Sequence, residues 1–397
     1  MSKMFLLLTV ILMDFLSGME FDLFVPSFPE LQVHFDISSF WVEAGLSVNF
    51  IGYCLSLFWV GAMADRYGRK PLLLLGLILF VGGSLLCVWA PFYNLLLMGR
   101  FLQGIGVAAP AILSFLIIAD SYPLSSQQRF LALLNGVMNI SVAVAPLVGS
   151  YITFYFHWRG NFMALLALGL LVLILVLFIP NKPLNHKKRD SLVAGYLGLF
   201  KSKDVILFIG YFILMIAPYW IFVGMSPILY MKSLGVSLTH FGYYQGLLAF
   251  VFALGCFLYS GLLSKCSHKA WLLGSFVVLV LSLLSLGAAT WFNCQNPLWI
   301  TLSLLPFVIS QIIPSTILYP LSLNIIPEAK GQVSAMIQGG RLIFCAISLQ
   351  IAGYFYQGSF QTIGIIIVLV IAAGIVPFII ILQRWNVLQK YGVSGQT

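Results

Sequence analysis

The stretch GAMADRYGRK, residues 61–70, lies between two long apolar runs and decides how the chain is read. A helix needs about 20 apolar residues to cross the hydrocarbon core of a bilayer. The runs on either side, 41–63 and 72–90, meet that length. Gly61 permits a close helix neighbour, and Gly68 suits a tight turn. The sequence therefore predicts two membrane-spanning helices joined by a short basic turn.

The charged residues of this turn predict a gate. Asp65 and Arg66 end the first run, and Arg69 follows the turn glycine. An acid such as Asp65 can cap the start of a neighbouring helix. Arg69 is placed to pair with an acid at the end of another helix, and Asp120 is the best-placed candidate. We expect this pair to hold one conformation and to break in the other.

The composition is that of a protein solvated by lipid. Of the 397 residues, 61% are hydrophobic and 8% are charged, whereas soluble domains carry about 25% charged residues. We expect an all-α membrane protein. Its predicted transmembrane helices, twelve in number, lie at 4–26, 41–63, 72–90, 95–118, 129–152, 161–180, 205–230, 239–263, 270–291, 298–322, 331–355 and 362–383.

The basic residues predict which ends face the cytoplasm. With twelve spans both termini lie on one side, and the loops of that side hold sixteen of the twenty Lys and Arg residues. Because cytoplasmic loops are enriched in Lys and Arg, we expect a multi-pass protein of the inner (plasma) membrane with both termini cytoplasmic. The net charge of +9 is interpreted as topogenic, so no nucleic-acid partner is expected.

The longest basic connection predicts two domains. A cytoplasmic linker at 181–204 separates 1–180 from 205–397, and each part holds six predicted spans. The stretches 61–72 and 261–272 precede the third and ninth spans, with glycine, a basic position and leucine in phase. Parallel six-helix repeats are a known transporter architecture. We therefore expect two six-helix bundles related by a pseudo-repeat.

Two motifs carry a resemblance to a known family. The 61–70 stretch resembles the loop between helices 2 and 3 of the major facilitator superfamily, with every key position present. Arg100, Gln103 and Gly104 match that superfamily's second motif. The resemblance implies the major facilitator fold, in which two helical bundles rock about a central cavity.

A third motif departs from the family pattern. Residues 145–150 resemble the antiporter motif of the superfamily, in which a Gly-Pro pair and a second glycine pair bend the helix and seal the cavity. Ala145 and Ser150 replace two of these glycines. Pro146 keeps the expected kink, and Gly149 keeps one small position.

The first predicted helix carries two acids. Asp14 and Asp22 precede a D-x-x-x-P-x-x-P ending that resembles the bicyclomycin-resistance (Bcr/CflA) branch of drug transporters. In an ideal helix they lie about 80° apart in azimuth and about 12 Å apart along the axis, so they can face one cavity at two depths. Glu20 lies about 120° from Asp14 in the opposite sense and is expected to face elsewhere. Acids at membrane depth commonly carry protons or bind substrate. The plainer alternatives are a structural partner of a buried arginine for Asp14, and an outer-surface acid for Asp22.

Arginines inside apolar runs also need a partner or a wet cavity. We expect Arg100 to modulate Asp14 if their helices abut, and the plainer alternative is an arginine that reaches to the interface. Further cavity candidates are Gln103, Arg341, Tyr53, Tyr219 and Tyr244.

These observations predict a proton-coupled secondary transporter that exports drugs or other small organic molecules by alternating access. No phosphate-binding glycine loop is present in the sequence, so the proton gradient is the expected energy source. We expect a monomer in the lipid bilayer, with no cofactor, no metal site and no enzyme activity. Two alternatives stay open: a dedicated siderophore or polycarboxylate metabolite carrier of either direction, and a transporter-like membrane receptor.

Overall fold

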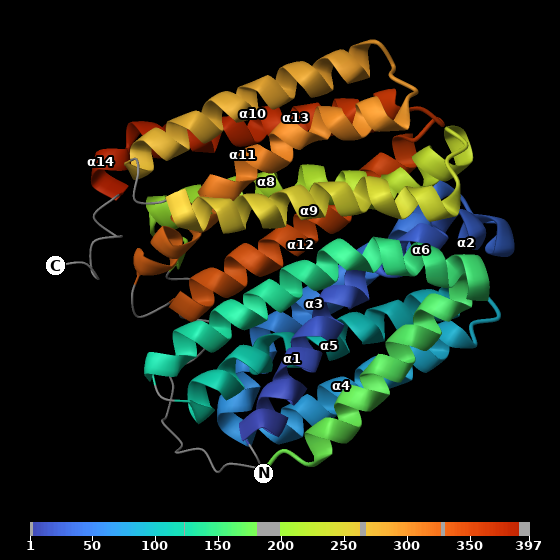
Figure 1. The fold of residues 1–397 in the computed structure, drawn as a ribbon, viewed down its shortest axis with the longest axis vertical. Helices are drawn as coiled ribbons and strands as arrows, with labels where there is room; N and C mark the ends of the chain where they lie inside the picture. Colours follow the sequence, from blue (N-terminus) through green and yellow to red (C-terminus); the bar gives the residue numbers. More distant parts are fainter. Residues whose placement is uncertain (1–2, 123, 181–198, 263–266, 327–329, 389–397) are drawn as a thin grey trace.

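The structure is a computed structural model that describes residues 3–122, 124–180, 199–262, 267–326 and 330–388. Every regular element in these ranges is helical (Figure 1). The long helices are α1 (Lys3–Asp22), α3 (Ser39–Tyr67), α4 (Arg69–Val88), α5 (Tyr93–Ser121), α6 (Leu124–Leu177), α8 (Lys203–Pro227), α9 (Leu238–Leu262), α10 (His268–Trp291), α11 (Pro297–Asn324), α12 (Lys330–Phe355) and α13 (Phe360–Gln383). The short elements are η1 (Val25–Ser27), α2 (Phe28–Phe35), the π-helical η2 (Ile228–Ser233) and α14 (Trp385–Leu388).

Ten segments in the described part of the chain are long and apolar enough to cross a membrane. One of them, 136–177, contains two helices, because the backbone of His157 (φ 58°, ψ −177°) interrupts α6. The 25 residues of α9 form a further long helix at the predicted span 239–263. Each predicted span therefore coincides with a described helix or helix segment, and the all-helical membrane fold is confirmed.

The first span differs from its prediction as one helix over 4–26. In the structure α1 ends at Asp22, η1 follows, and α2 continues to Phe35. Pro26 and Pro29 explain the break, since proline lacks the N–H that a continuing helix needs and fits only a first turn. Asp22 consequently lies at a helix end, with chain continuing beyond it.

An acid on α2 fastens this short helix to the break in α6. The Glu30 carboxylate accepts a hydrogen bond from the Trp158 backbone N–H at 2.9 Å and lies 3.0 Å from His157 Nδ1. The same end of the molecule carries η2, on the right of Figure 1. We call it the α2 end.

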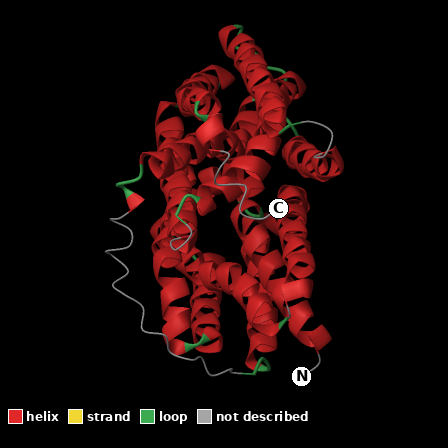
Figure 2. Ribbon diagram, turned by 90° about the vertical axis from the view of Figure 1, so that its left-hand side faces the viewer, coloured by secondary structure: helices red, strands yellow, loops and turns green. Residues whose placement is uncertain are grey.

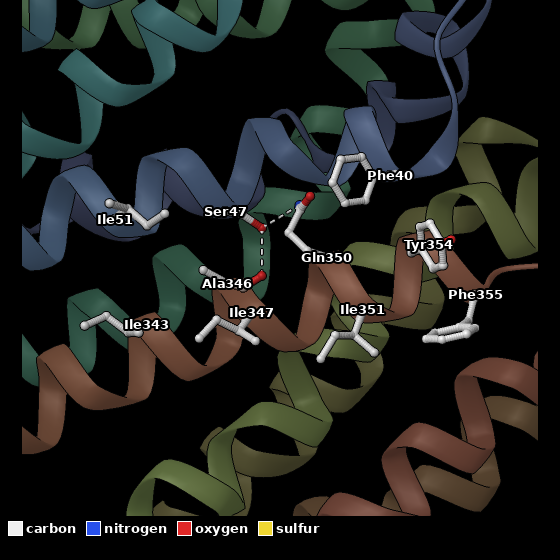
Figure 3. Close-up of a pocket in the computed structure, with 10 residues that line it drawn as sticks. All are labelled: Phe40, Ser47, Ile51, Ile343, Ala346, Ile347, Gln350, Ile351, Tyr354 and Phe355. Atoms are coloured by element: carbon white, nitrogen blue, oxygen red, sulfur yellow. Dashed lines mark hydrogen bonds between the residues drawn. The ribbon is translucent and has the colours of Figure 1, made fainter.

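The N-terminal helices α1–α6 meet the C-terminal helices α8–α13 mainly where α3 packs on α12 and where α6 packs on α9. We call these two contacts the seam. Across it the Ser47 hydroxyl donates to the Ala346 carbonyl at 3.2 Å and accepts from Gln350 Nε2 at 3.0 Å (Figure 3). The hydroxyls of Tyr151 and Tyr243 lie 3.0 Å apart. Because these contacts lie toward the α2 end, that end of the seam is closed in this conformation.

The outer surface of the bundle is apolar. Leu171, Leu284 and Leu369 are 46%, 65% and 63% exposed on three different helices. Figure 2 shows the helices packed side by side, so such side chains cover the flanks that a bilayer would solvate. The domain limits 1–180 and 205–397 and the cytoplasmic termini stay predictions, and most of the linker, 181–198, lies outside the described residues.

Candidate substrate and proton site

Both acids predicted on the first helix are buried. Asp14 and Asp22 are each 1% exposed. Asp14 lies beside the Ser114 side chain of α5. Asp22 has no hydrogen-bond partner for either carboxylate oxygen in the described part of the chain, and the adjacent Phe21 packs edge-on against Trp220 of α8, in the other half. Asp22 is therefore the acid that lies at the boundary between the halves.

An aromatic cluster fills this boundary near Asp22. Phe21 of α1 lies at centroid distances of 5.3 Å from Phe50, 5.4 Å from Tyr53 and 6.1 Å from Trp220. Trp220 is also 4.9 Å from Phe50 and 6.0 Å from Tyr219. Aromatic faces carry partial negative charge and attract cations. Two predicted cavity residues, Tyr53 and Tyr219, thus belong to one cluster shared by α1, α3 and α8.

Arg100 is paired with an acid other than Asp14. Its Nη1 lies 2.7 Å from Glu20 Oε1, and both side chains are fully buried. Asn49 Nδ2 donates to the same Glu20 oxygen at 2.7 Å. The guanidinium also donates to the Gly45 carbonyl at 3.3 Å and lies 4.1 Å from the centre of the Phe24 ring. The expectation that Arg100 acts on Asp14 is corrected, because α5 presents Arg100 to the Glu20 side of α1.

Gln103 extends this pair into a cluster. Its Oε1 accepts from Arg100 Nη1 at 2.7 Å, and its Nε2 donates to the Ser84 hydroxyl at 2.8 Å. Side chains of α1, α3, α4 and α5 are thereby joined by hydrogen bonds with no exposure to solvent. We call Glu20, Asn49, Ser84, Arg100 and Gln103 the ion-pair cluster. It ties N-terminal helices together, so Arg100 and Gln103 are not free to bind cargo in this conformation.

The turn between α3 and α4 has the geometry expected of a gate. Gly68 adopts φ 97°, a left-handed conformation that favours glycine. Arg69 Nε lies 3.1 Å from Asp120 Oδ2 at the end of α5. Gly61, Asp65 and Arg66 lie on α3, and the side chains of Asp65 and Arg66 are outside the described part. The gating role of this set stays a prediction.

The helix around Pro146 contacts both the α1 break and the seam. The backbone stays helical through Pro146. A Cβ at Gly149 would lie 1.9 Å from the Leu23 carbonyl oxygen, which is far too close. A Cβ at Gly242 of α9 would lie 3.0 Å from the Ser150 hydroxyl oxygen and 3.2 Å from the Pro146 carbonyl oxygen. The segment 146–150 therefore packs against backbone on both sides, and glycine at 149 is required by that approach.

The two remaining cavity candidates make their contacts with residues outside the aromatic cluster. Arg341 is half-buried on α12, where its Nη1 donates to Gln338 Oε1 at 2.7 Å. No acidic residue of the described ranges forms an ion pair with it. Tyr244 packs edge-on against Tyr230 at 5.3 Å, within the C-terminal helices.

Sequence reasoning missed one acid altogether. Glu43 of α3 is fully buried, and neither carboxylate oxygen has a hydrogen-bond partner in the described residues. The available signal was an acid within the apolar run 41–63, close to its start. Its position there is also typical of an interfacial residue, and the sequence does not show that α8 and α12 cover it.

With this geometry in place, the family can be stated. Residues 10–349 match the family model described as Major Facilitator Superfamily. The match covers most of the chain, so the chain belongs to the Major Facilitator Superfamily. It is a multi-pass membrane protein and a secondary transporter of that family, not an enzyme.

Curated relatives at moderate identity are multidrug resistance proteins. Multidrug resistance protein MdtL of Salmonella paratyphi C is 32% identical over 227 residues, and MdtL of Shigella flexneri serotype 5b is 31% identical over 220 residues. Each match covers 54% of this chain and 55% of the relative. The matched part thus spans about half the length of these relatives.

Solved transporter structures share the fold. A D-xylose–proton symporter has a TM-score of 0.72 at 17% identity, covering 94% of this chain and 97% of that one. A bacterial homologue of the human lysosomal transporter Spinster, in an inward-facing and occupied conformation, has a TM-score of 0.71 at 17% identity, covering 98% of each chain. At such identities the likeness shows the fold alone.

Proposed function

We propose that this protein exports drugs or other small organic molecules across the inner membrane in exchange for protons. The observation that carries the proposal is Asp22, a buried carboxyl whose two oxygens have no hydrogen-bond partner among the described residues, beside an aromatic cluster to which both halves contribute. A lipophilic cation would find there an acid for its charge and aromatic faces for its apolar body. The name of the MdtL relatives, multidrug resistance protein, agrees with this substrate class.

The exchange follows from the cost of burying charge. A carboxylate in an apolar interior must be neutralised by a proton or paired with a cation. Proton and cationic substrate therefore compete for Asp22. Asp14, about 12 Å along the helix by ideal geometry, is proposed as a second proton site on the route. The proton gradient then supplies the energy for export.

Alternating access would use the two ends of the seam. The α2 end is closed in this conformation by the Ser47–Gln350 and Tyr151–Tyr243 contacts. We propose that Arg69 and Asp120 constrain the opposite end, and that breaking and remaking their pair accompanies the switch. With the predicted topology, the α2 end faces outward, so its contacts close the outer end of the seam in this conformation.

Transport in liposomes tests the proposal. The purified chain is reconstituted, a proton gradient is imposed, and accumulation of tetraphenylphosphonium is measured. Asp22→Asn is expected to lose proton-driven accumulation, because the amide binds neither proton nor cation. Asp36→Asn is the matched control, since Asp36 is an exposed acid directly after α2 at φ 50°, a conformation that asparagine accepts. Normal pumping by Asp22→Asn would remove Asp22 from the mechanism.

One observation favours the polycarboxylate alternative. Arg341 has no acidic ion-pair partner among the described residues, so its positive charge is available to an anionic substrate. If this alternative holds, the proton gradient should drive transport of a tricarboxylate, and Arg341→Gln should abolish that transport. Tetraphenylphosphonium should not be transported. The same liposomes distinguish the two substrate classes.

A further inference from the structure

Glu43 occupies a position that the proposed coupling residues do not share. It lies within the first two turns of α3, at the α2 end, and is fully buried. Like Glu43, Asp22 has no hydrogen-bond partner among the described residues, but it lies at the end of α1 near the aromatic cluster. Figure 3 shows a pocket along the seam, which Phe40 and Ser47 of α3 line together with Gln350 and Tyr354 of α12.

Two glycines from the opposite half make room for the Glu43 side chain. A Cβ at Gly224 of α8 would lie 2.6 Å from Glu43 Oε2. A Cβ at Gly353 of α12 would lie 3.3 Å from Glu43 Cγ. The carboxyl group of one half is therefore enclosed by backbone of the other half, and the enclosure exists only while the seam is closed.

No charged group compensates Glu43 in the described structure. From α5, the Tyr93 hydroxyl is engaged by the backbone of α3, since it donates to the carbonyls of Trp41 and Val42 at 2.6 and 3.2 Å. The same helix carries Arg100, which is paired with Glu20. From α8 and α12, Gly224 and Gly353 lie against Glu43 and carry no charge, and no basic residue of the described ranges forms an ion pair with it.

An ionised carboxylate in this enclosure would lose its hydration without gaining a partner, which is strongly unfavourable. The neutral acid fits the same space at far lower cost. Opening the α2 end would move Gly224 and Gly353 away and return the carboxyl group to water, where the ionised form is favoured.

We propose that Glu43 is a second kind of proton site, at which one proton binds as the α2 end closes and leaves as it opens. This proton enters and leaves on the same side of the membrane. It therefore makes closure depend on the pH of that side and adds nothing to the number of protons carried across. The inference rests on the alternating access included in the proposed function, and it concerns none of the residues assigned there to cargo.

Distances between spin labels at the α2 end test this site. Labels at Phe92→Cys and Trp291→Cys, both exposed and in different halves, are placed on a chain whose native cysteines are replaced and which retains transport. Pulsed dipolar spectra of the substrate-free protein in nanodiscs are recorded from pH 5 to 9. One linked proton changes the ratio of closed to open populations by about tenfold per pH unit. The closed state is expected to dominate at low pH and to decline as pH rises.

The variants decide whether Glu43 is responsible. In the wild type the logarithm of the closed-to-open ratio should fall with pH, and Glu43→Gln should make that fall shallower by about one log unit per pH unit. The α2 end of this variant should then stay closed at high pH. Glu43→Met, also neutral, should do the same and serves if the glutamine variant fails to assemble. Gly353→Ala keeps the acid but crowds it, so it should shift the ratio at every pH without changing the slope.

An unchanged slope in both neutral variants would overturn the proposal. A transport measurement distinguishes failure of the Glu43 proposal from failure of the proposed drug export. Glu43→Gln should keep the wild-type number of protons exchanged per tetraphenylphosphonium ion. A wild-type protein that moves no cation would refute drug export and would leave the spin-label result standing.

Discussion

The ion-pair cluster and the seam show two ways of keeping acids in a membrane protein. Glu20 is fully buried with a charged partner at 2.7 Å and an amide donor at 2.7 Å. Glu43 and Asp22 are equally buried with no hydrogen-bond partner in the described residues. Glu20 joins helices of one half, whereas the other two lie where the halves meet. The difference teaches that a compensated acid serves architecture, and an uncompensated acid at a moving boundary is suited to gain and lose protons.

Removing the partner of the compensated acid should have the largest effect. Arg100→Met leaves Glu20 buried beside an uncharged side chain, and breaking a buried pair in this way costs about 3–5 kcal/mol. Thermal unfolding in detergent should show a strongly lowered midpoint and poor recovery from membranes. Arg100→Met combined with Glu20→Gln should recover part of the loss. A single variant as stable as wild type would remove the architectural role of the cluster.

A steric change near Asp22 distinguishes the effect of helix packing on transport from the effect of the Asp22 charge. Gly149→Ala would place a methyl group against the Leu23 carbonyl, next to Asp22 in the chain, without altering any acid. Overpacking of this kind costs about 1–3 kcal/mol. We expect lower thermal stability together with slower transport that keeps its dependence on the proton gradient. Gly136→Ala is the control, because a Cβ there meets nothing within 4 Å.

Removing an uncompensated acid should spare stability. Asp22→Asn replaces a carboxyl group that makes no hydrogen bond in the described structure, so the unfolding midpoint should change by less than the equivalent of about 1 kcal/mol. Proton-driven transport should nevertheless be lost. If Asp22→Asn unfolds as readily as Arg100→Met, the distinction between compensated and uncompensated acids does not hold.

The gate pair should have the smallest effect on stability. Arg69 and Asp120 have side-chain exposures of 17% and 38%, and ion pairs with such access to solvent contribute about 0–1 kcal/mol. Asp120→Asn should leave the unfolding midpoint close to wild type. It should change the balance of conformations, which spin labels at the end opposite α2 would detect. Wild-type distances in that variant would argue against a gate.

Periodicity and composition were enough to predict the fold, because each apolar run of membrane length became a helix. The same reasoning predicted the acids of α1 and the acid that Arg69 contacts. It did not predict the partner of Arg100. A helical wheel gives the azimuth of Glu20 about its own axis but says nothing about which helix lies there.

Two further features required the three-dimensional structure. The division of the first span arises because Pro26 and Pro29 each begin a new turn, a choice that hydropathy does not register. The burial of Glu43 depends on glycines at 224 and 353, both from the other half of the chain. Contacts between residues so far apart in sequence leave no local pattern.

The contacts between the Glu30 carboxylate and the backbone break at His157 bear on how the α2 end opens. Because one carboxylate accepts from the Trp158 backbone and lies against the His157 ring, α2 is anchored to the N-terminal helices. When the halves separate at the α2 end, α2 should stay attached to α6 and move with the N-terminal helices. The weaker 3.4 Å contact between Gln32 and Lys232 of η2 would be the one to part. A departing molecule would then pass between α2 and the C-terminal helices, and η2 would be the element that moves away to open this exit.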